Sequence, residues 1–287
     1  MPGAVDLHTH SSVSDGTESP AQLVRAAVAA GLGTIALTDH DSTAGWHEAE
    51  KAAFGTGLTI IPGMELSTRY SWKSVHLLAY LIDPMNADLV AETGRIRTSR
   101  LSRAESIVGR IAADYDLTWD DVLAQTTSGA TVGRPHIADA LVAKGHVPTR
   151  SAAFESILHP RTGYFEPHYA PDPLEAVRLV RAAGGVPVLA HPATRGRSAV
   201  IPEDRLALLV DAGLFGLEIE HRENTEDGKL RLRELADRFG LVATGSSDYH
   251  GAGKPNRLGE NTTSPEVLER IVAEGTGSVP FRSQPDS

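Results

Sequence analysis

The residues of this chain that could do chemistry are histidines and carboxylates in short clusters. His8 and His10 flank a threonine, and Asp39-His40-Asp41 forms a second cluster. The other candidates are spread along the chain: Asp15, Glu65, His76, His191, Asp248 and His250. Imidazole nitrogens and carboxylate oxygens bind Mn, Fe and Zn in proteins. Because the chain has no cysteine, any metal ion must be held by such nitrogen and oxygen donors.

Most of these residues come shortly after an apolar run that predicts a β-strand. The predicted strands are 4–7, 34–38, 58–62, 75–82, 186–190, 216–220 and 241–245. His76 is the exception, because it lies at the start of its strand. In α/β barrels the carboxyl ends of the strands converge on one mouth, where reactive groups collect. Six of the twelve histidines belong to this set, so we expect its members to meet there.

The elements that must position these residues alternate between strand and helix. Amphipathic segments at 20–30, 173–183, 203–212 and 225–239 predict helices, and the first has Ser19 as N-cap, Pro20 at its first position and Gly31 just past its end. Alternating β and α units imply parallel strands with helices outside, hence an open sheet or a barrel. The tail after Gly275 is expected to be frayed.

One region breaks the alternation. From 86 to 165 the patterns are helical only, at 87–115, 119–125, 134–144 and 151–158. This predicts a helical insertion domain, 86–165, between the two parts of one α/β domain, 1–85 and 166–287. The insertion would form a lid or side wall over the site.

Composition limits the classes of function. The 287 residues carry a formal net charge of −10, which argues against a protein that coats duplex nucleic acid. No stretch approaches the roughly 18 apolar residues that span a bilayer, so no membrane association is expected. Met1-Pro2-Gly3 leads directly into a strand without a signal-like segment, and the expected location is the cytoplasm.

The number of candidate ligands indicates more than one ion. Nine nitrogen and oxygen ligands exceed what a single ion needs, so a cluster of two or three divalent ions is predicted. Asp39 and Asp41 are expected to orient neighbouring ligands rather than to bind metal.

Taken together, the clusters resemble those of the PHP (polymerase and histidinol phosphatase) superfamily. The segments that carry the resemblance are Asp6-Leu7-His8-Thr9-His10-Ser11, Ser14-Asp15-Gly16, Leu37-Thr38-Asp39-His40-Asp41, Pro62-Gly63-Met64-Glu65, Val75-His76-Leu77-Leu78, Leu189-Ala190-His191-Pro192 and Ser247-Asp248-Tyr249-His250. The resemblance implies a distorted (β/α)7 barrel. It also implies that His8, His10, Glu65 and Asp248 hold one ion, that Glu65, His76 and His191 hold a second with Glu65 bridging, and that Asp15, His40 and His250 hold a third.

The segment Gly133-Arg134-Pro135-His136-Ile137-Ala138 and the helical insertion resemble one branch of the superfamily. That branch contains phosphatases of AMP and of nucleoside 3′,5′-bisphosphates, and 5′→3′ exonucleases of short RNA. The resemblance implies that Arg134 and His136 bind the substrate phosphate, which a guanidinium fork suits. The alternative is an exposed arginine at a helix start.

Other charged residues leave two interpretations open. The basic run Arg95, Arg97, Arg100 and Arg103 is either a solvated helix face or a guide for an oligonucleotide backbone. His221 ends a strand and is a further candidate for substrate contact. The remaining histidines are expected to be structural or at the surface: His47, His146, His159 and His168.

The predicted function is hydrolysis of a phosphate ester, on a nucleotide or at the 5′ end of a short oligonucleotide, by a metal-held hydroxide. The sequence indicates no side-chain general acid. The alternatives are a histidinol-phosphate phosphatase, a non-catalytic metal-binding regulatory module, and a metal-dependent amide or deaminating hydrolase on a related barrel. Amide and deaminating hydrolases of that kind usually carry a carbamylated lysine or a different order of histidines, and no lysine ends a predicted strand here.

Overall fold

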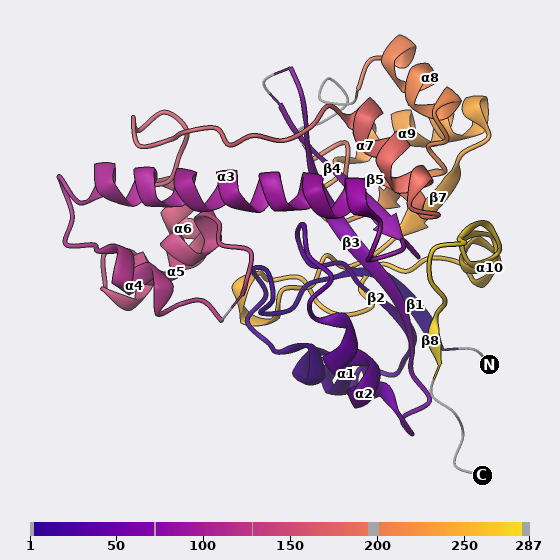
Figure 1. Ribbon diagram of the computed structural model, residues 1–287, viewed down its shortest axis with the longest axis horizontal. Helices are drawn as coiled ribbons and strands as arrows, with labels where there is room; N and C mark the ends of the chain where they lie inside the picture. The colour runs from indigo at the N-terminus through magenta and orange to yellow at the C-terminus, as the bar shows by residue number, and fades with distance from the viewer. Residues whose placement is uncertain (1–2, 72, 128, 195–200, 283–287) are drawn as a thin grey trace.

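The computed structural model describes residues 3–71, 73–127, 129–194 and 201–282, and it has an α/β fold (Figure 1). Its strands are β1 (Ala4–Thr9), β2 (Leu32–Leu37), β3 (Thr59–Tyr70), β4 (Lys73–Tyr80), β5 (Val186–Ala190), β6 (Gly216–Glu220), β7 (Val242–Gly245) and β8 (Phe281–Arg282). The sheet follows chain order from β1 to β7, and β8 pairs with β3. The parallel-rich α/β architecture predicted from the alternating pattern is confirmed.

Strand β3 is longer than predicted, and this changes the position of Glu65. Up to Pro62 the strand pairs in parallel with β2, and from Gly63 onward it pairs antiparallel with β4. Pro62-Gly63 therefore marks a change of partner, not the end of the strand at 62 that the sequence suggested. Glu65 accordingly lies inside β3.

Strand β4 runs opposite to its neighbours, since it pairs antiparallel with both β3 and β5. The start of an antiparallel strand lies at the same edge of the sheet as the ends of its neighbours. His76, opposite Ser67 and Ala190, is thereby brought to the edge where β5 ends. His76 therefore reaches this edge from the first half of β4, whereas the sequence had placed it at the start of a strand beginning at 75.

The two ends of the strand path approach each other. Thr9, at the end of β1, forms a backbone bridge with Tyr249, which follows β7. The His10 N–H donates to the Tyr249 carbonyl at 2.9 Å. Closure into a complete barrel stays a prediction.

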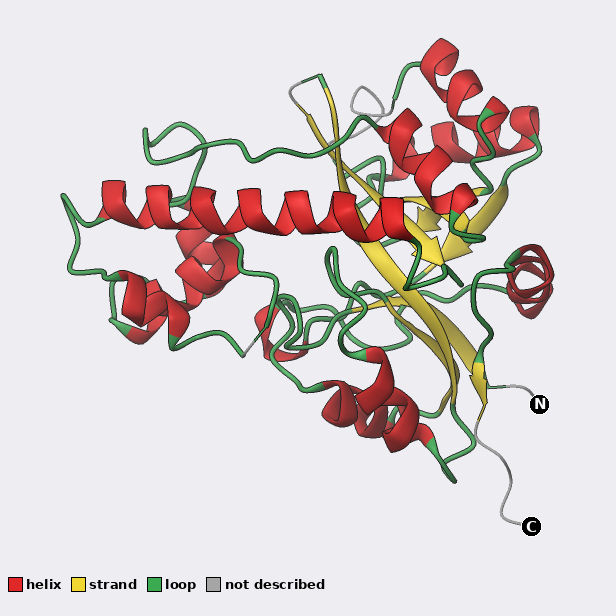
Figure 2. Ribbon diagram, in the orientation of Figure 1, coloured by secondary structure: helices red, strands yellow, loops and turns green. Residues whose placement is uncertain are grey.

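Helices cover the sheet (Figure 2). They are α1 (Pro20–Ala29), α2 (Trp46–Ala53), α7 (Pro173–Ala182), α8 (Glu203–Asp211), α9 (Glu226–Phe239) and α10 (Pro265–Glu274). Ser19 caps α1 as predicted, with Gln22 completing a capping box. The sequence interpretation missed α2 and α10, and it was wrong about the tail immediately after Gly275, because the chain continues into β8 against β3.

Four further helices lie beside the sheet: α3 (Ala87–Ile111), α4 (Trp119–Leu123), α5 (Arg134–Ala143) and α6 (Arg150–Glu155). Figure 1 shows α3 running from the sheet to the group formed by α4, α5 and α6. That group has a separate apolar core, which includes Ile107, Ile137 and Leu141. The domain boundaries at 85/86 and 165/166 stay a prediction.

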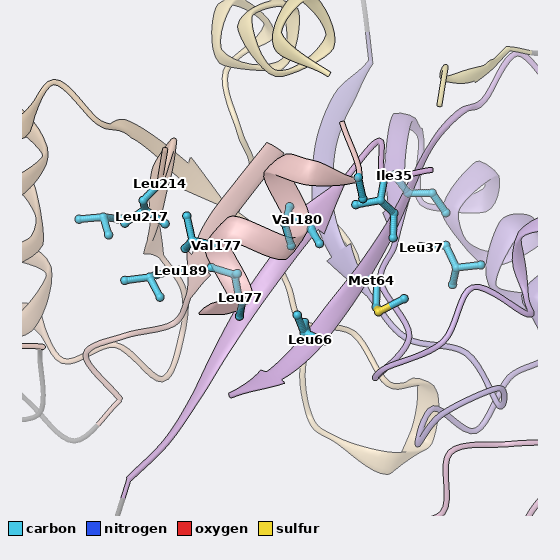
Figure 3. Packing of buried hydrophobic residues seen from close by; sticks show 14 of the residues in the cluster. Ile35, Leu37, Met64, Leu66, Leu77, Val177, Val180, Leu189, Leu214 and Leu217 are labelled. Carbon is cyan, nitrogen blue, oxygen red and sulfur yellow. The ribbon is translucent and has the colours of Figure 1, made fainter. Parts of the chain in front are cut away.

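The main core lies between the sheet and its covering helices. Side chains alternate across a strand, so Ile35 and Leu37 face this core while Ala36 faces a smaller cluster on the other side of β2. Figure 3 shows Leu77 and Leu189 of adjacent strands near Val177 of α7. Full burial of one such side chain stabilises the fold by roughly 1.5–3 kcal/mol, which holds the strand ends rigidly in place.

Among the described residues, no helix combines the length and the apolar character needed to cross a membrane. Helix α3 is long enough, with 25 residues, but it contains five charged arginines, at positions 95, 97, 100, 103 and 110.

Candidate metal centre

The nine predicted ligands come together at one edge of the sheet. His8 lies near the end of β1 and His10 directly after it, while Glu65 lies in β3 beside His40, with which it forms a backbone bridge. His191 directly follows β5. Asp15, Asp248 and His250 are buried in the same cluster, and their contacts are given below. Convergence of strand ends thus produces the cluster that the sequence predicts.

Glu65 is at the centre of this cluster, and its two oxygens face different histidines. Oε1 lies 2.6 Å from His76 Nδ1 and 3.2 Å from His191 Nε2. Oε2 faces three ring nitrogens: His10 Nε2 at 3.1 Å, His40 Nδ1 at 3.2 Å and His8 Nε2 at 3.3 Å. A carboxylate with one oxygen toward each of two ligand groups has the geometry of a bridge between cations.

Two carboxylates from the loops complete the cluster. Asp248 Oδ1 lies 3.4 Å from His8 Nε2 and 3.3 Å from His10 Nε2. Asp15 lies 3.2 Å from His250 Nε2 through Oδ1 and 3.8 Å from His40 Nε2 through Oδ2. The sets whose ligand atoms all lie within 4.8 Å of one another include His8, His10, Glu65 and Asp248; His10, Asp15, His40 and His250; and His40, Glu65 and His76.

The contacts of His250 place one of its ring nitrogens against the Asp15 carboxylate. Its Nδ1 lies 2.8 Å from the Asp248 carbonyl oxygen, which can only accept, so Nδ1 carries the proton. Burial, with the charge of Lys254, lowers the pKa of His250, which favours the neutral ring. Its Nε2 lone pair then faces the Asp15 carboxylate, and among the described residues it has no hydrogen-bond partner. A metal ion between these two atoms would satisfy both acceptors.

The charge balance leads to the same conclusion. Burial alone would lower the pKa of His10, but hydrogen bonds with Asp248 and Glu65 outweigh burial and raise it to about 9. For His8 as well, burial is outweighed by the carboxylates of Glu218, Glu65 and Asp248, and the pKa is raised well above its usual value. A positive charge is strongly favoured at this point, and divalent cations would supply it.

Glu218, which the sequence interpretation missed, orients two of the ligands. Its Oε1 accepts from His8 Nδ1 at 3.0 Å and from the Ser246 hydroxyl at 2.7 Å. Its Oε2 accepts the His191 N–H at 2.8 Å. A proton fixed on Nδ1 leaves the Nε2 lone pair of His8 toward Glu65 and Asp248. The only signal in the sequence is a carboxylate between Leu217 and Ile219 in the middle of a strand.

The side chain of Asp39 is linked to the predicted ligand His10 through one hydroxyl, whereas that of Asp41 contacts Ser67 and Arg100; a role of either in orienting ligands stays a prediction. Asp39 accepts the hydroxyl of Ser14 at 2.7 Å, and that hydroxyl lies 3.3 Å from His10 Nδ1. Asp41 accepts the N–H and the hydroxyl of Ser67, both at 2.7 Å, and pairs with Arg100 Nε at 2.9 Å.

Backbone strain is concentrated in the same place. Asp41, His191 and Asp248 have φ of 53°, 30° and 53°, in the left-handed region that L-residues seldom adopt. Each such position costs about 1–3 kcal/mol and persists where surrounding contacts fix it, often at functional sites. The cluster is therefore held in a conformation that the local sequence does not favour.

Two adjoining cavities, of about 520 and 470 Å³, open beside the cluster. Both are lined by His40, His76, Arg134 and Lys254. The Arg134 guanidinium carbon also lies 5.2 Å from the centre of the Phe154 ring. Arg134 is thus at the cavity, as a substrate-binding residue must be.

His136 occupies a different environment from Arg134. It is buried, its Nδ1 accepts the Gly133 N–H at 3.1 Å, and it has a backbone hydrogen bond with Ser14. This geometry favours a role in joining α5 to the loop that carries Asp15. Direct contact of His136 with substrate stays a prediction.

The basic run divides into two parts. Arg95 and Arg97 are exposed, whereas Arg100 and Arg103 are each 7% exposed and line the larger cavity. His168, expected to be structural or at the surface, lines that cavity as well. His221 is buried, with Nδ1 accepting the Glu223 N–H and Nε2 3.6 Å from Asp248 Oδ2.

Several known proteins are similar to this chain in sequence. Residues 6–114 match the PHP domain. A 3′,5′-nucleoside bisphosphate phosphatase from Chromobacterium violaceum is 31% identical over 272 residues, which cover 94% of this chain and 95% of that protein. The chain belongs to the PHP family. A 5′-3′ exoribonuclease from Haemophilus influenzae is 31% identical over 258 residues, covering 89% of this PHP protein and 93% of the exoribonuclease.

A solved structure supports the same assignment. A candidate metal-dependent phosphoesterase from Bifidobacterium adolescentis superposes with a TM-score of 0.93 at 41% identity, covering 96% of this chain and 98% of that one. Membership of the PHP family and the ligand-rich site make this protein a metal-dependent phosphoric ester hydrolase.

Proposed function

We propose that this PHP protein hydrolyses phosphate esters of nucleotides, such as AMP and nucleoside 3′,5′-bisphosphates, or the 5′ end of short oligonucleotides. The observation that supports this most is the 520 Å³ cavity, whose wall combines the ligands Asp15, His40 and His76 with Arg134. A cavity of this size lies within the roughly 300–1,000 Å³ range of small-molecule sites. The names of the relatives favour nucleotides over histidinol phosphate.

The metal centre is proposed to hold two or three divalent ions, with Mn, Fe or Zn suited to its imidazole and carboxylate donors. Glu65 bridges two ligand groups, while Asp15 and Asp248 supply the remaining negative charge. When bound, such ions lower the pKa of a water molecule and neutralise phosphate charge. The cytoplasm stays the expected location.

The protein residues have separate tasks in this reaction. Arg134 binds a phosphate oxygen through its planar fork. Glu218 and Asp39 keep His8 and His10 in the orientation that directs Nε2 inward. Lys254 Nζ, 2.7 Å from Asp248 Oδ2, adds positive charge at the wall of both cavities and favours phosphate binding there.

A phosphate-release screen on metal-reconstituted protein tests the proposal. AMP, a nucleoside 3′,5′-bisphosphate, a short 5′-phosphorylated RNA and histidinol phosphate are compared with Mn present. Release from a nucleotide or the RNA is expected, and release from none of the four contradicts the proposal. Preference for histidinol phosphate would replace the nucleotide assignment with the alternative.

Two variants separate the roles of metal and substrate residues. Glu65→Ala is expected to lower the metal content at two positions, and full occupancy would refute the bridge. Arg134→Ala is expected to raise the KM for nucleotide with the metal content unchanged, and unaltered kinetics would remove Arg134 from the site.

A further inference from the structure

Arg103 and His168 form a second polar feature in the wall of the larger cavity. Arg103 lies on α3, and His168 lies on the segment between α6 and α7, which runs back along α3. Arg103 Nη1 donates to His168 Nδ1 at 2.8 Å, while Arg69 Nη2 donates to the His168 carbonyl oxygen at 2.8 Å. The ring and the guanidinium group therefore hold each other in fixed orientations.

Both side chains retain a buried donor that the described residues do not use. Because Nδ1 of His168 accepts from Arg103, the proton of the neutral ring lies on Nε2. Burial and the charges of Arg100 and Arg103 lower the pKa of His168 far below its usual value, so the ring is neutral. His168 Nε2 and Arg103 Nε are buried, and neither has a hydrogen-bond partner within the described part of the chain. A buried unsatisfied donor costs about 1–3 kcal/mol.

The charge of Arg103 is also unbalanced. Its neighbour Arg100 pairs with Asp41 and donates to the Ser67 hydroxyl. Arg103 is in no ion pair among the described residues, although only 7% of its surface is exposed. Burial and the charges of Arg100 and Arg134 lower its pKa to about 9. Uncompensated buried charge destabilises a free protein, and a bound anion would remove that penalty.

We propose that Arg103 and His168 form a second phosphate subsite, which binds a phosphate group of the substrate other than the one that is hydrolysed. The inference rests on the proposed function, because it places that second phosphate in the cavity shared with His40 and His76. The second phosphate is either that of a nucleoside bisphosphate or the next one along a short oligonucleotide. A nucleoside monophosphate leaves the subsite without a phosphate.

Phosphate suits this subsite better than a neutral group does. The free donors belong to a guanidinium and an imidazole. The same cavity wall carries five cationic side chains against three carboxylates: Arg100, Arg103, Arg134, Arg150 and Lys254 against Asp15, Glu155 and Glu223. Phosphate oxygens accept several charge-assisted hydrogen bonds at once. A water molecule could occupy the donors, but it would leave the charge of Arg103 unbalanced.

The test is a substrate comparison with Arg103→Met, which retains an unbranched apolar side chain and removes the charge. A nucleoside 3′,5′-bisphosphate, a 5′-phosphorylated dinucleotide and the two nucleoside monophosphates are assayed with the metal-loaded protein. The ratio of kcat/KM for the doubly phosphorylated substrate to that for the monophosphates is expected to fall by about 10–100-fold, as for loss of a charged hydrogen bond. Whether the bisphosphate or the dinucleotide loses more identifies the source of the phosphate.

Arg178→Met is the matched control, because Arg178 is exposed and pairs only with Glu175 three residues away. It removes the same charge far from the cavity, and its substrate ratio should equal that of the wild type. Arg103→Lys keeps the charge without the fork and should recover part of the ratio. An unchanged ratio in Arg103→Met, or an equal loss on all substrates, would overturn the subsite.

Thermal unfolding distinguishes substrate binding from a purely structural role. Arg103→Met removes buried like-charge repulsion but also leaves His168 Nδ1 without its donor, so the ligand-induced shift in Tm, not the Tm of the free variant, separates the two roles: a purely structural role predicts equal shifts in variant and wild type. Adenosine 3′,5′-bisphosphate should raise the Tm of metal-free wild type more than that of the variant. If the wild type hydrolyses no nucleotide, the proposed function fails, and this binding measurement still decides the subsite.

Discussion

Replacement of Glu218 by glutamine tests how the metal ligands are oriented. Glu218 is fully buried and accepts from His8 Nδ1, the Ser246 hydroxyl and the His191 N–H. In Glu218→Gln the amide oxygen can still accept from His191, but the NH2 group then faces the Nδ1 proton of His8. The Ser246 hydroxyl can rotate to accept. His8 cannot, unless its proton moves to Nε2, where the lone pair is needed for a metal ion.

The size of the effect follows from these contacts. Loss of a residue that orients a ligand usually lowers metal affinity by about 10–100-fold, which is about 1.4–2.8 kcal/mol. Two apposed buried donors add a folding cost of about 1–3 kcal/mol. We therefore expect both a weaker affinity for Mn and a lower Tm in Glu218→Gln. Relative to its wild-type value, the affinity for Mn should change more than the Tm.

Chelator competition and calorimetry would measure the affinity, and Glu220→Gln provides the control. Glu220 lies two residues on in β6, but a register shift between the two positions separates their directions. Its side chain is 42% exposed and pairs with Arg233. Wild-type Mn affinity in Glu218→Gln, or an equal loss in Glu220→Gln, would refute the reasoning.

Three further outcomes are expected. The pKa of His10 is raised to about 9 in the metal-free protein, so a metal ion must displace a proton from this ring and the affinity for Mn should rise with pH up to about 9. Calorimetry in buffers of different ionisation heat would detect the released proton. An affinity for Mn that does not depend on pH would contradict this prediction. Arg150 donates to Asp139 at 2.8 Å and to the Asp15 carbonyl at 2.9 Å. Arg150→Ala should therefore lower the free energy of unfolding in urea by about 1.5–3 kcal/mol. An unchanged urea midpoint would show that these hydrogen bonds do not stabilise the fold. Ile137→Ala should destabilise the core around α5 by about 2–5 kcal/mol with the metal content unchanged; metal loss in that variant would show that the two cores are coupled.

Much of the site could be predicted because it depends on strand ends. Parallel strands bring their carboxyl ends to one edge whatever the sequences between them, so His8, His40 and His191 could be grouped without coordinates. The position of His76 could not be explained, because the antiparallel direction of β4 is a property of pairing and is not visible in the strand's own residues. The same limit applies to Glu65, where β3 changes partner instead of ending.

Glu218 was missed, and the burial of Arg100 and Arg103 was not predicted, for different reasons. Glu218 and Glu220 have the spacing of one strand face, and only the irregular register between β6 and β7 separates them. Arg100 and Arg103, in contrast, continue the helical stripe of Leu89 and Ile96 at intervals of three and four residues. A periodicity count over α3 would have placed these two arginines on its buried face.

Helix α3 belongs to two cores at once. Leu89 and Ile96 pack in the core of the sheet, while Ala104 and Ile107 pack in the core of the helical group. A continuous helix of 25 residues extends about 37 Å, and packing at both of its ends makes it a rigid connection between the two cores. The helical group therefore has no joint in α3 about which to swing away from the sheet, and we expect the entrance of the cavity to keep a constant width. An entrance of constant width would select substrates by their diameter. It would not limit the length of a single-stranded oligonucleotide, which can extend out of the cavity.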